Sequence, residues 1–480
     1  MLLLLAVTGM LCAVVQLAAA EPPPAGALLD IGGPGGCVAE MGAVVGLEQH
    51  DPAADGCAEG RTVQELHHVV LSTDGRFVYA AGGSPTHDPG DESAIAVFSR
   101  DAQTGAVSQL PGKVGCTERT ETPRDLGCAI GRNLHGLRFV TVSSDDRFVY
   151  ATGETGIAVF RRDVATGSLT QLSGYLGCIS SKTPGCRRAI GAQSVEDLVI
   201  TQKGARAYSA STGGYVLMFA RNPQTGTLRP LGCLGEGSHL EAQPGCALGR
   251  ATDRARSVTL SPDERFVYVA DLEDAVAIFA RNPRSGGLTQ LPGTAGCISE
   301  TGADGCATAR GIYGSHRVTI TRDGRSAYLA GKRGGKGGST LAVFSRNPAT
   351  GALRQLPGPA GCFTEDGSDG CTVGRLIQGA HAALLDAAER TLYLAADQFQ
   401  GGIAVFRRDT STGALTQLPG KFGCLSPIDW EGCTISRRMG GIHYLALSRD
   451  GRFLYAAGEK AQALVVLRVV APVAFPPGPT

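Results

Sequence analysis

The sequence has no excess of either charge, because 44 lysines and arginines balance 44 aspartates and glutamates over 480 residues. Without a basic surplus, nothing in the composition indicates binding to nucleic acid. No C-x-x-C spacing occurs, which argues against zinc ribbons and thioredoxin-like redox chemistry. The chain also lacks a G-x-S-x-G nucleophile elbow, a P-loop and the glycine pattern of dinucleotide-binding folds. The motifs of several large enzyme and nucleotide-binding classes are therefore absent.

Long apolar runs are missing too, except at the start, where residues 1–20 are uncharged and end in three alanines. This pattern predicts a secretory signal peptide with a small-residue cleavage site, although basic residues do not precede the apolar run. A signal anchor is the alternative. Removing Cys12 with this segment leaves fourteen of the 15 cysteines, and an even number in an exported chain favours disulfides. We therefore expect a secreted or periplasmic protein without a stable membrane anchor.

What the chain does contain is an internal repeat. The cysteines form seven close pairs, at positions 37/57, 116/128, 178/186, 233/246, 297/306, 362/371 and 424/433. After each pair the sequence reads as four short strands, with Asp-Gly hairpin signals such as "TDGRF" between the first two. Four short strands repeated seven times, at a period of roughly sixty residues, predict an all-β, seven-bladed β-propeller. An all-β array that does not close is the alternative.

The two ends of the repeat region complement each other. The seventh unit stops after its third strand, whereas "AGALLDIGGPGGC" at residues 25–37 aligns with "TGALRQLPGPAGC" at residues 350–362. An N-terminal strand is therefore expected to complete the last blade and close the ring, which pairs an otherwise exposed edge. This gives a propeller over residues 21–470 and a C-terminal tail over residues 471–480.

The cysteines are expected to be structural. Pairing within each loop is the simplest connectivity, while pairing between loops stays open on sequence alone. A closed loop of about ten residues contributes roughly 2–3 kcal/mol in the chain-entropy model. An arginine recurs shortly after the second cysteine and is predicted to tie the loop to a blade; the positions are Arg61, Arg132, Arg250, Arg310, Arg375 and Arg437.

One column of the repeat contains no apolar residue. It lies two residues before each apolar first strand begins and consists of His67, Arg138, Glu196, Arg256, His316, His381 and His443. Because the first strands of a propeller line its channel, these side chains are predicted to form a ring at the channel mouth. The next column is mixed and is expected to support the ring; it consists of His68, Phe139, Asp197, Ser257, Arg317, Ala382 and Tyr444.

The ring offers three kinds of chemistry. Arg138 and Arg256 suit a carboxylate or phosphate, since a planar guanidinium matches such anions. Glu196 lies between these cations and is a poor candidate for a general base, whereas a histidine is a good one. The four histidines of the ring fall on the consecutive blades 5, 6, 7 and 1, and together they would also suit Cu, Fe or Zn. A merely polar, wet channel is the alternative to a functional site.

The motifs "SPDERFVYVA" (261–270) and "IAVFRRDVATGSLTQL" (157–172) resemble those of lactonase-type seven-bladed propellers with YVTN-like repeats. That group includes 6-phosphogluconolactonases and the fungal carboxymuconate cycloisomerases. In the cycloisomerase type a histidine, a glutamate and two arginines act on a carboxylated substrate. The resemblance thus implies roles for His67 or another ring histidine, Glu196, Arg138 and Arg256.

Together these observations predict an exported lactonase-like enzyme that acts on a small anionic lactone or carboxylate at the channel mouth. Two alternatives remain open at this stage. One is a non-catalytic secreted propeller that binds a protein or glycan, and the other is a metal-dependent oxidase that uses the arc of histidines.

Overall fold

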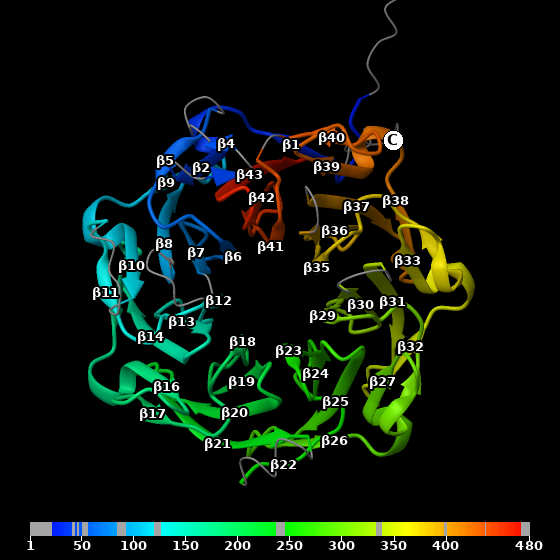
Figure 1. The fold of residues 1–480 in the computed structure, drawn as a ribbon, viewed down its shortest axis with the longest axis horizontal. Coiled ribbons are helices and arrows are strands. Elements are labelled where there is room, and N and C mark those ends of the chain that lie inside the picture. The colour runs from blue at the N-terminus through cyan, green and yellow to red at the C-terminus, as the bar shows by residue number, and fades with distance from the viewer. Residues whose placement is uncertain are drawn as a thin grey trace, which may run out of the picture.

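The computed structural model describes residues 22–40, 44–45, 48–49, 56–83, 93–119, 126–236, 245–332, 338–397, 401–436 and 438–471. Seven β-sheets of five or six strands each stand around a central axis (Figure 1). The predicted all-β, seven-bladed propeller is therefore confirmed. The predicted signal peptide lies outside the described residues, and so does the predicted tail apart from Ala471.

Three antiparallel strands form the inner part of each blade, and their order along the chain is their order outwards from the channel. The inner strands of blades 1 to 7 are β6 (Leu66–Leu71), β12 (Leu137–Val142), β18 (Val195–Ile200), β23 (Ala255–Leu260), β29 (Ser315–Ile320), β35 (Ala380–Leu385) and β41 (Ile442–Leu447). The second strands are β7 (Phe77–Gly83), β13 (Phe148–Gly153), β19 (Arg206–Ser211), β24 (Phe266–Asp271), β30 (Ser326–Gly331), β36 (Thr391–Ala396) and β42 (Phe453–Gly458). The third strands are β8 (Ser93–Arg100), β14 (Gly156–Arg162), β20 (Tyr215–Arg221), β25 (Ala275–Arg281), β31 (Thr340–Arg346), β37 (Gly402–Arg408) and β43 (Ala463–Val469).

The outer strand is more complex than the one short strand that the repeat predicts. In six blades it consists of two pieces that both pair with the third strand, separated by a 3-10 turn. In blade 1, Pro111 cannot donate to the ladder and Gly112 has a φ of 54°, so the strand breaks there. The first pieces are β9 (Val107–Gln109), β15 (Leu169–Gln171), β26 (Leu288–Gln290), β32 (Leu353–Gln355), β38 (Leu415–Gln417) and β1 (Leu28–Asp30). The turns are η2 (Gly112–Gly115), η3 (Gly174–Gly177), η4 (Gly293–Gly296), η6 (Gly358–Gly361), η8 (Gly420–Gly423) and η1 (Pro34–Gly36).

The second pieces begin at the first cysteine of each pair. They are β10 (Cys116–Arg119), β16 (Cys178–Ser180), β27 (Cys297–Ser299), β33 (Cys362–Thr364), β39 (Cys424–Ser426) and β2 (Cys37–Glu40). Blade 3 has a continuous outer strand, β21 (Leu228–Gly235). A short fifth strand then runs parallel to the outer one; these are β11 (Ala129–Gly131), β17 (Arg187–Arg188), β22 (Ala247–Leu248), β28 (Ala307–Thr308), β34 (Thr372–Val373), β40 (Thr434–Ile435) and β5 (Ala58–Gly60). The remaining elements are η5 (Ala303–Gly305), η7 (Ser368–Gly370) and the separate pair β3 (Val44–Val45) and β4 (Glu48–Gln49).

All seven predicted disulfides form within their own loops, with sequence separations of 8 to 20 residues. Each one joins the outer strand to the region of the parallel fifth strand, so it staples the outer edge of a blade. Seven disulfides indicate an oxidising compartment outside the cytosol. Within the described part of the chain, no helix is long and apolar enough to span a bilayer.

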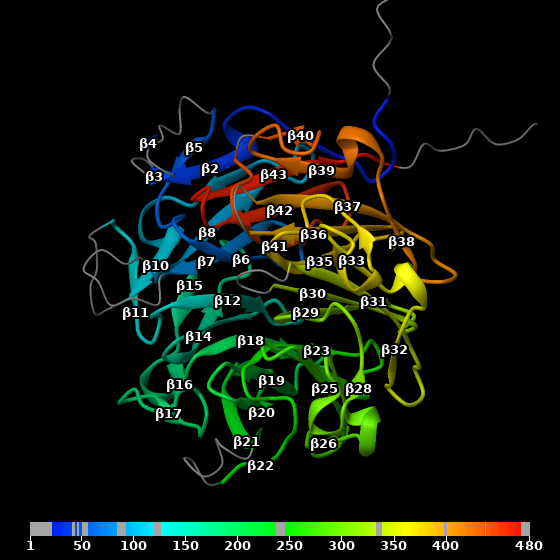
Figure 2. The same ribbon diagram turned by 45° about the vertical axis from the view of Figure 1, so that its right-hand side comes forward.

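The ring closes as predicted. Strand β1 pairs antiparallel with β43, with Leu28 opposite Val469, and β2 pairs with the same strand. Figures 1 and 2 show these N-terminal strands in blue beside the C-terminal strands in red. Blade 7 is therefore built from both ends of the described chain, which removes the free edge that an open array would leave.

Neighbouring blades are clamped by a tyrosine and an arginine. The Tyr79 hydroxyl of blade 1 donates to the Gly167 carbonyl of blade 2 at 2.8 Å and accepts from Arg162 Nε at 2.5 Å. Gly167 has a φ of 76°, and a Cβ there would meet the Phe77 ring, so the turn requires glycine. The clamp occurs at six seams, with the pairs Tyr79/Arg162, Tyr150/Arg221, Tyr208/Arg281, Tyr268/Arg346, Tyr328/Arg408 and Tyr455/Arg100.

The arginine after the second cysteine has the structural role that was predicted, with a more specific partner. Arg61 of blade 7 reaches blade 1, where its guanidinium donates to the Leu126 and Gly112 carbonyls. Gln109 receives the Arg61 backbone N–H and donates to its carbonyl. These arginines therefore bind the outer strand and disulfide loop of the next blade. Arg437 lies outside the described residues.

Candidate functional site

Every ring residue sits at a β-bulge. In blade 1 the register passes from Leu66 opposite Gly82 to His68 opposite Ala81, so His67 is the extra residue. The same shift occurs in the six other inner strands. The ring residues are thus the second residues of the inner strands. The sequence had suggested that they precede these strands, and that prediction is wrong. A bulge breaks strict alternation, which lets two successive side chains face the channel.

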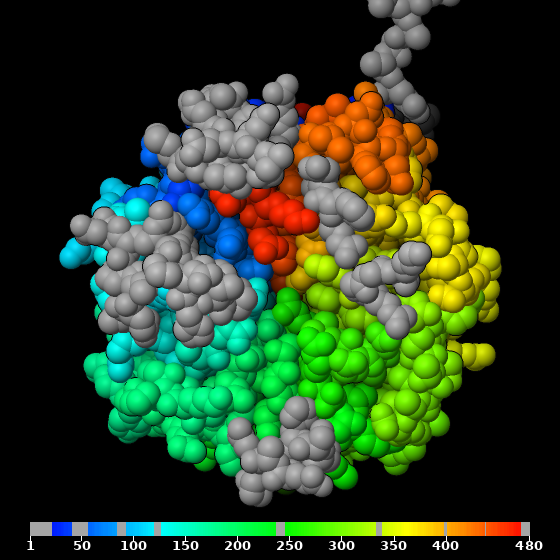
Figure 3. All heavy atoms as spheres, viewed as in Figure 1, coloured from blue at the N-terminus to red at the C-terminus, as the bar shows by residue number. Residues whose placement is uncertain are grey.

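The ring residues gather at one cavity of about 550 Å³ at the channel mouth. Six of the seven line it, namely His67, Arg138, Arg256, His316, His381 and His443. Glu196 is buried beside them, where it accepts hydrogen bonds from Arg256 and, at 3.3 Å, from the Thr212 hydroxyl. Figure 3 shows the face of the molecule on which N-terminal (blue), middle (green) and C-terminal (red) parts of the chain meet around the centre. The predicted ring therefore converges on one pocket.

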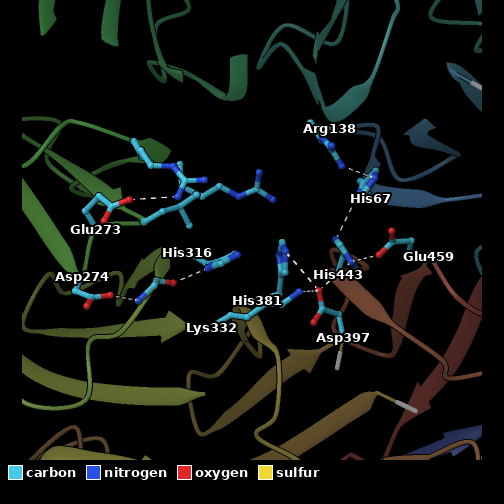
Figure 4. A pocket seen from close by; sticks show the side chains of 14 residues that line it. His67, Arg138, Glu273, Asp274, His316, Lys332, His381, Asp397, His443 and Glu459 are labelled. Atoms are coloured by element: carbon cyan, nitrogen blue, oxygen red, sulfur yellow. Dashed lines mark hydrogen bonds and ion pairs between the residues drawn. The ribbon is translucent and has the colours of Figure 1, made fainter. Parts of the chain in front are cut away.

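Three ring residues from adjacent blades form a chain. Arg138 Nη1 lies 2.8 Å from His67 Nε2, and His67 Nδ1 lies 3.1 Å from His443 Nδ1. On its other side, His443 Nε2 lies 3.1 Å from Asp397 Oδ2 and 2.5 Å from Glu459 Oε2 (Figure 4). A cation at one end and two carboxylates at the other are therefore connected through two imidazoles.

The other two histidines differ in how their nitrogens are used. His316 Nδ1 lies 2.6 Å from the Gly314 carbonyl, which only accepts, so the proton of neutral His316 is on Nδ1. Its Nε2 then carries a lone pair, and the ring points into the cavity in Figure 4. His381 packs between the rings of His316 and His443, at centroid distances of 4.5 and 4.2 Å.

Sequence reasoning missed the acidic and basic groups that complete the site. Asp397, Glu459 and Lys332 each follow the second strand of a blade, and Lys332 Nζ lies 2.5 Å from Asp397 Oδ2. A signal for them was available, because this column also breaks the repeat. It reads Gly83, Glu154, Thr212, Leu272, Lys332, Asp397 and Glu459 in blades 1 to 7.

Burial and neighbouring charges divide the histidines. Burial, together with the nearby His443, lowers the pKa of His67 and of His381 well below the usual range. Burial and Arg256 lower the pKa of His316 to about 3. For His443 burial acts in the same direction, but hydrogen bonds to Asp397 and Glu459 outweigh it and raise the pKa. Three ring histidines are therefore neutral at neutral pH, and His443 is the one drawn towards protonation.

The carboxyl groups respond in the opposite sense. Burial opposes ionisation of Asp397, yet His443 and Lys332 hold its pKa well below the usual range. Burial likewise opposes ionisation of Glu459, and His443 again lowers the pKa overall. Both side chains are therefore carboxylates at neutral pH and act as hydrogen-bond acceptors.

The next position along the inner strands fills the channel below the cavity. Arg317 Nη1 lies 2.8 Å from Asp197 Oδ2 and 3.0 Å from the Tyr444 hydroxyl. The His68 ring contacts Phe139 and Tyr444, at centroid distances of 3.8 and 4.3 Å. Because these residues come from blades 1, 2, 3, 5 and 7, they meet across the axis. The cavity therefore has a floor, in agreement with the supporting role predicted for this column.

Two sets of three donors lie close enough to share a metal ion: His67, His443 and Glu459, and His381, Asp397 and His443. Within the first set, His67 Nδ1 and His443 Nδ1 are already hydrogen-bonded to each other. His443 Nε2 is 2.5 Å from Glu459, whereas tetrahedral zinc sets its donors about 3.3 Å apart. The ammonium of Lys332 on Asp397 and the guanidinium of Arg138 on His67 would also repel a cation. The residues fit an acid–base network better than a Cu, Fe or Zn centre.

Comparisons with known proteins agree with the fold. A putative 6-phosphogluconolactonase from Bacteroides fragilis is 19% identical, with a TM-score of 0.52 over 83% of this chain and 92% of that one. A periplasmic gluconolactonase from Pseudomonas aeruginosa is 16% identical, with a TM-score of 0.50 over 79% and 93%. Kuenenia stuttgartiensis hydrazine synthase is 14% identical, with a TM-score of 0.51 over 84% and 96%. No family model and no curated protein sequence matches the chain. At these identities the comparisons show the propeller fold alone, and one fold can carry unrelated activities.

Proposed function

We propose that this protein is a lactonase-like hydrolase that opens a small lactone bearing a carboxylate or phosphate in the cavity at the channel mouth. The observation that carries the proposal is that Arg138 contacts no carboxylate among the described residues. Of the four cations that line the cavity, Arg254 pairs with Glu273, Arg256 with Glu196 and Lys332 with Asp397. Among the described residues, the partner of Arg138 is the neutral His67, and its Nε has none.

An uncompensated guanidinium in a partly buried pocket is a natural anchor for an anion. Its planar fork can donate two parallel hydrogen bonds to a carboxylate or phosphate. The electrostatic gain is larger in the cavity than in water because the effective dielectric constant is lower. These considerations favour an anionic substrate over a neutral one, and the cavity volume of about 550 Å³ suits a small molecule.

Two kinds of histidine support hydrolysis. His316 presents the lone pair of Nε2 to the cavity and can accept the proton of a water as its oxygen attacks the lactone carbonyl carbon. The C–O bond of the ring then breaks, and the leaving alkoxide receives a proton from a general acid, for which His443 is the candidate. The product is a hydroxy acid. The low pKa of His316 makes it a weak base in the empty site, and a bound anion would offset the effect of Arg256 that depresses this pKa.

The test is a hydrolysis assay on matched sugar lactones with and without a phosphate group, using the full chain and two variants. His316→Gln keeps a donor for the Gly314 carbonyl but removes the base, so kcat/KM should fall about 10²–10⁴-fold. Arg138→Met should raise KM for the anionic lactones about 10–100-fold and leave KM for the neutral ones unchanged. Arg161→Met, on the exposed side of β14, is the matched control and should behave as the unmodified protein.

A preparation that hydrolyses none of these lactones contradicts the proposal, and binding of an anion without turnover would favour a binding propeller. Undiminished activity in both His316→Gln and Arg138→Met would move the active site away from the channel mouth.

A further inference from the structure

Arg138 fixes the direction of the hydrogen-bond chain across the mouth. A guanidinium carries only donors and keeps its proton, so His67 Nε2, at 2.8 Å, must be the acceptor. The proton of His67 is therefore on Nδ1. That N–H faces His443 Nδ1 at 3.1 Å, which in turn must accept. The proton of His443 is then on Nε2, where Asp397 and Glu459 both offer carboxylate oxygens.

When both imidazoles are neutral, no two N–H groups of this chain face each other, and the Nε2–H of His443 is directed to the side of the two carboxylates (Figure 4). The two carboxylates nevertheless favour a second proton on His443, because an imidazolium between two anions is stabilised by both. A doubly protonated His443 would direct its Nδ1–H at the Nδ1–H of His67. His67 could relieve that conflict only by moving its own proton to Nε2, which faces Arg138. An imidazolium at His443 and the Arg138–His67 hydrogen bond therefore exclude each other.

The groups that surround His443 come from seven elements or loops. They are His67 on β6, Arg138 on β12, Arg256 on β23, Lys332 after β30, His381 on β35, Asp397 after β36 and Glu459 after β42. Within this set the carboxylates favour protonation of His443, and the cations oppose it. Lys332 contacts the chain at the carboxylate of Asp397, whereas Arg138 is the one cation of these three that is bonded to His67. Arg138 therefore acts through the tautomer of His67 as well as through its charge.

We propose that Arg138 controls His443: while Arg138 is bonded to His67, His443 stays neutral, and when an anion draws Arg138 away, His67 reverses its tautomer and His443 takes up one proton from solvent. This inference rests on the proposed function only in assigning the anion to Arg138. It makes His443 a general acid that becomes protonated when the substrate binds. Asp397 and Glu459 are positioning residues, because they hold His443 and receive its Nε2–H.

The consequence is a coupling between anion binding and proton uptake at one site. In the free protein the buried His443 carries no positive charge beside Lys332, and the proton arrives together with the negative charge that compensates it. The leaving oxygen of a bound lactone would then receive the proton from His443, which returns to the neutral form. Release of the anionic product lets Arg138 rebind His67 and restores the starting tautomers.

The experiment reads the tautomers directly. The full chain is labelled with ¹⁵N-histidine, and long-range ¹⁵N–¹H spectra, which distinguish the two neutral tautomers from imidazolium, are recorded over a pH series. Arg138→Met removes the donor to His67 and imitates loss of Arg138 to an anion. Arg254→Met is the matched control, because Arg254 lines the same cavity but pairs with Glu273. The signals of His67 and His443 are assigned from their disappearance in His67→Gln and His443→Gln.

In the unmodified protein at neutral pH we expect His67 with its proton on Nδ1 and a neutral His443 with its proton on Nε2. In Arg138→Met we expect His67 with its proton on Nε2 and a His443 that titrates at least about one pH unit higher. Arg254→Met should resemble the unmodified protein.

Identical His67 tautomers in the unmodified protein and in Arg138→Met overturn the proposal. So does an imidazolium at His443 in the unmodified protein at neutral pH. Because the readout needs no substrate, a protein that hydrolyses no lactone can still show the expected tautomers, and an active lactonase can lack them. The two proposals therefore fail separately.

Discussion

The seams between blades and the channel mouth are built from the same repeat, yet they follow opposite rules. At six seams a tyrosine and an arginine recur in the same geometry, and each tyrosine hydroxyl bonds a turn glycine of the next blade. At the mouth, the equivalent position is His, Arg or Glu according to the blade. Residues that keep the blades together must repeat, because every seam has the same shape. The ring residues differ between blades, as expected if they contribute different groups to one site.

The comparison predicts that a seam residue affects stability strongly, and Arg162 gives the largest effect. Its side chain is fully buried, and it contacts the Tyr79 hydroxyl and the Asp146 carboxylate. Arg162→Met leaves Asp146 without its cation, so the free energy of unfolding should fall by about 3–5 kcal/mol.

The adjacent Arg161 is exposed, with its guanidinium over the Phe148 ring, and supplies the control. In a urea titration of both variants, Arg161→Met should lower the free energy of unfolding by no more than about 1 kcal/mol. Equal losses in the two variants would show that the clamp does not stabilise the seam. The folded fraction of Arg162→Met should hydrolyse the lactones of the proposed assay as the unmodified protein does, because Arg162 is not among the residues that line the cavity.

The second prediction separates the two regions by pH. His67, His316 and His381 stay neutral in the folded protein, whereas histidines of the unfolded chain bind protons below a pH of about 6.5. The unfolded state thus gains protons on acidification, so stability falls as the pH drops below that value, by up to about 1.4 kcal/mol per pH unit for each histidine. Burial also lowers the pKa of His68, so the raised pKa of His443 acts in the opposite direction on one residue against four.

At alkaline pH the tyrosines at the seams determine how stability changes with pH. The pKa values of Tyr150, Tyr268 and Tyr455 are raised to about 12 by burial, so these residues stay protonated when unfolded tyrosines ionise near a pH of about 10. Stability should therefore also fall above that pH. Urea titrations across both ranges check this, and His381→Gln should flatten the acid slope alone. If one variant flattens both the acid and the alkaline slope, the acid slope cannot be assigned to the channel mouth and the alkaline slope to the seams.

The smallest effect is expected at the seam where the ring closes. The Tyr393 hydroxyl donates to the Gly26 carbonyl at 3.0 Å, and no arginine within the described chain contacts it. Val469 occupies the place of the arginine, since it is paired with Leu28 as Arg100 is paired with Val107. Val469→Arg should add a donor to Tyr393 and raise the free energy of unfolding by about 1 kcal/mol.

Val469→Met is the control for side-chain length, and it should produce no gain. A loss of stability in Val469→Arg would mean that the closing seam has no room for the clamp. It would also mean that the two chain ends, and not the missing arginine, determine how this seam is packed.

Much of the architecture could be predicted from the sequence because the patterns that encode it are local and repeated. The Asp-Gly turns, the cysteine pairs and the match between residues 25–37 and 350–362 predicted the hairpins, the staples and the ring closure. The break in the outer strand was missed, although "LPG" recurs there, because a short strand with an interruption reads as one strand followed by a loop. The bulges were missed because a register shift leaves no distinct residue type.

The site was predicted in part for the same reason. The ring column stood out because its positions are equivalent in every blade, and polar residues replace the apolar ones expected in a strand. Asp397, Glu459 and Lys332 follow the second strands, and their relation to the ring appears only when the blades are placed around the axis. Glu196 was predicted to face the cavity with the others, and its pairing with Arg256 draws it aside.

The sequence by itself determined the number of blades, the staples, the closing strand and the identity of the ring residues, since each is encoded within one repeat or by one alignment of two repeats. The tertiary structure alone decided which side chains of the ring contact one another. His67 and His443 are 376 residues apart in the chain and 3.1 Å apart at Nδ1, and Arg138 reaches the first while Asp397 and Glu459 hold the second. Which nitrogen carries a proton depends on these contacts between blades, and no pattern within a single repeat contains them.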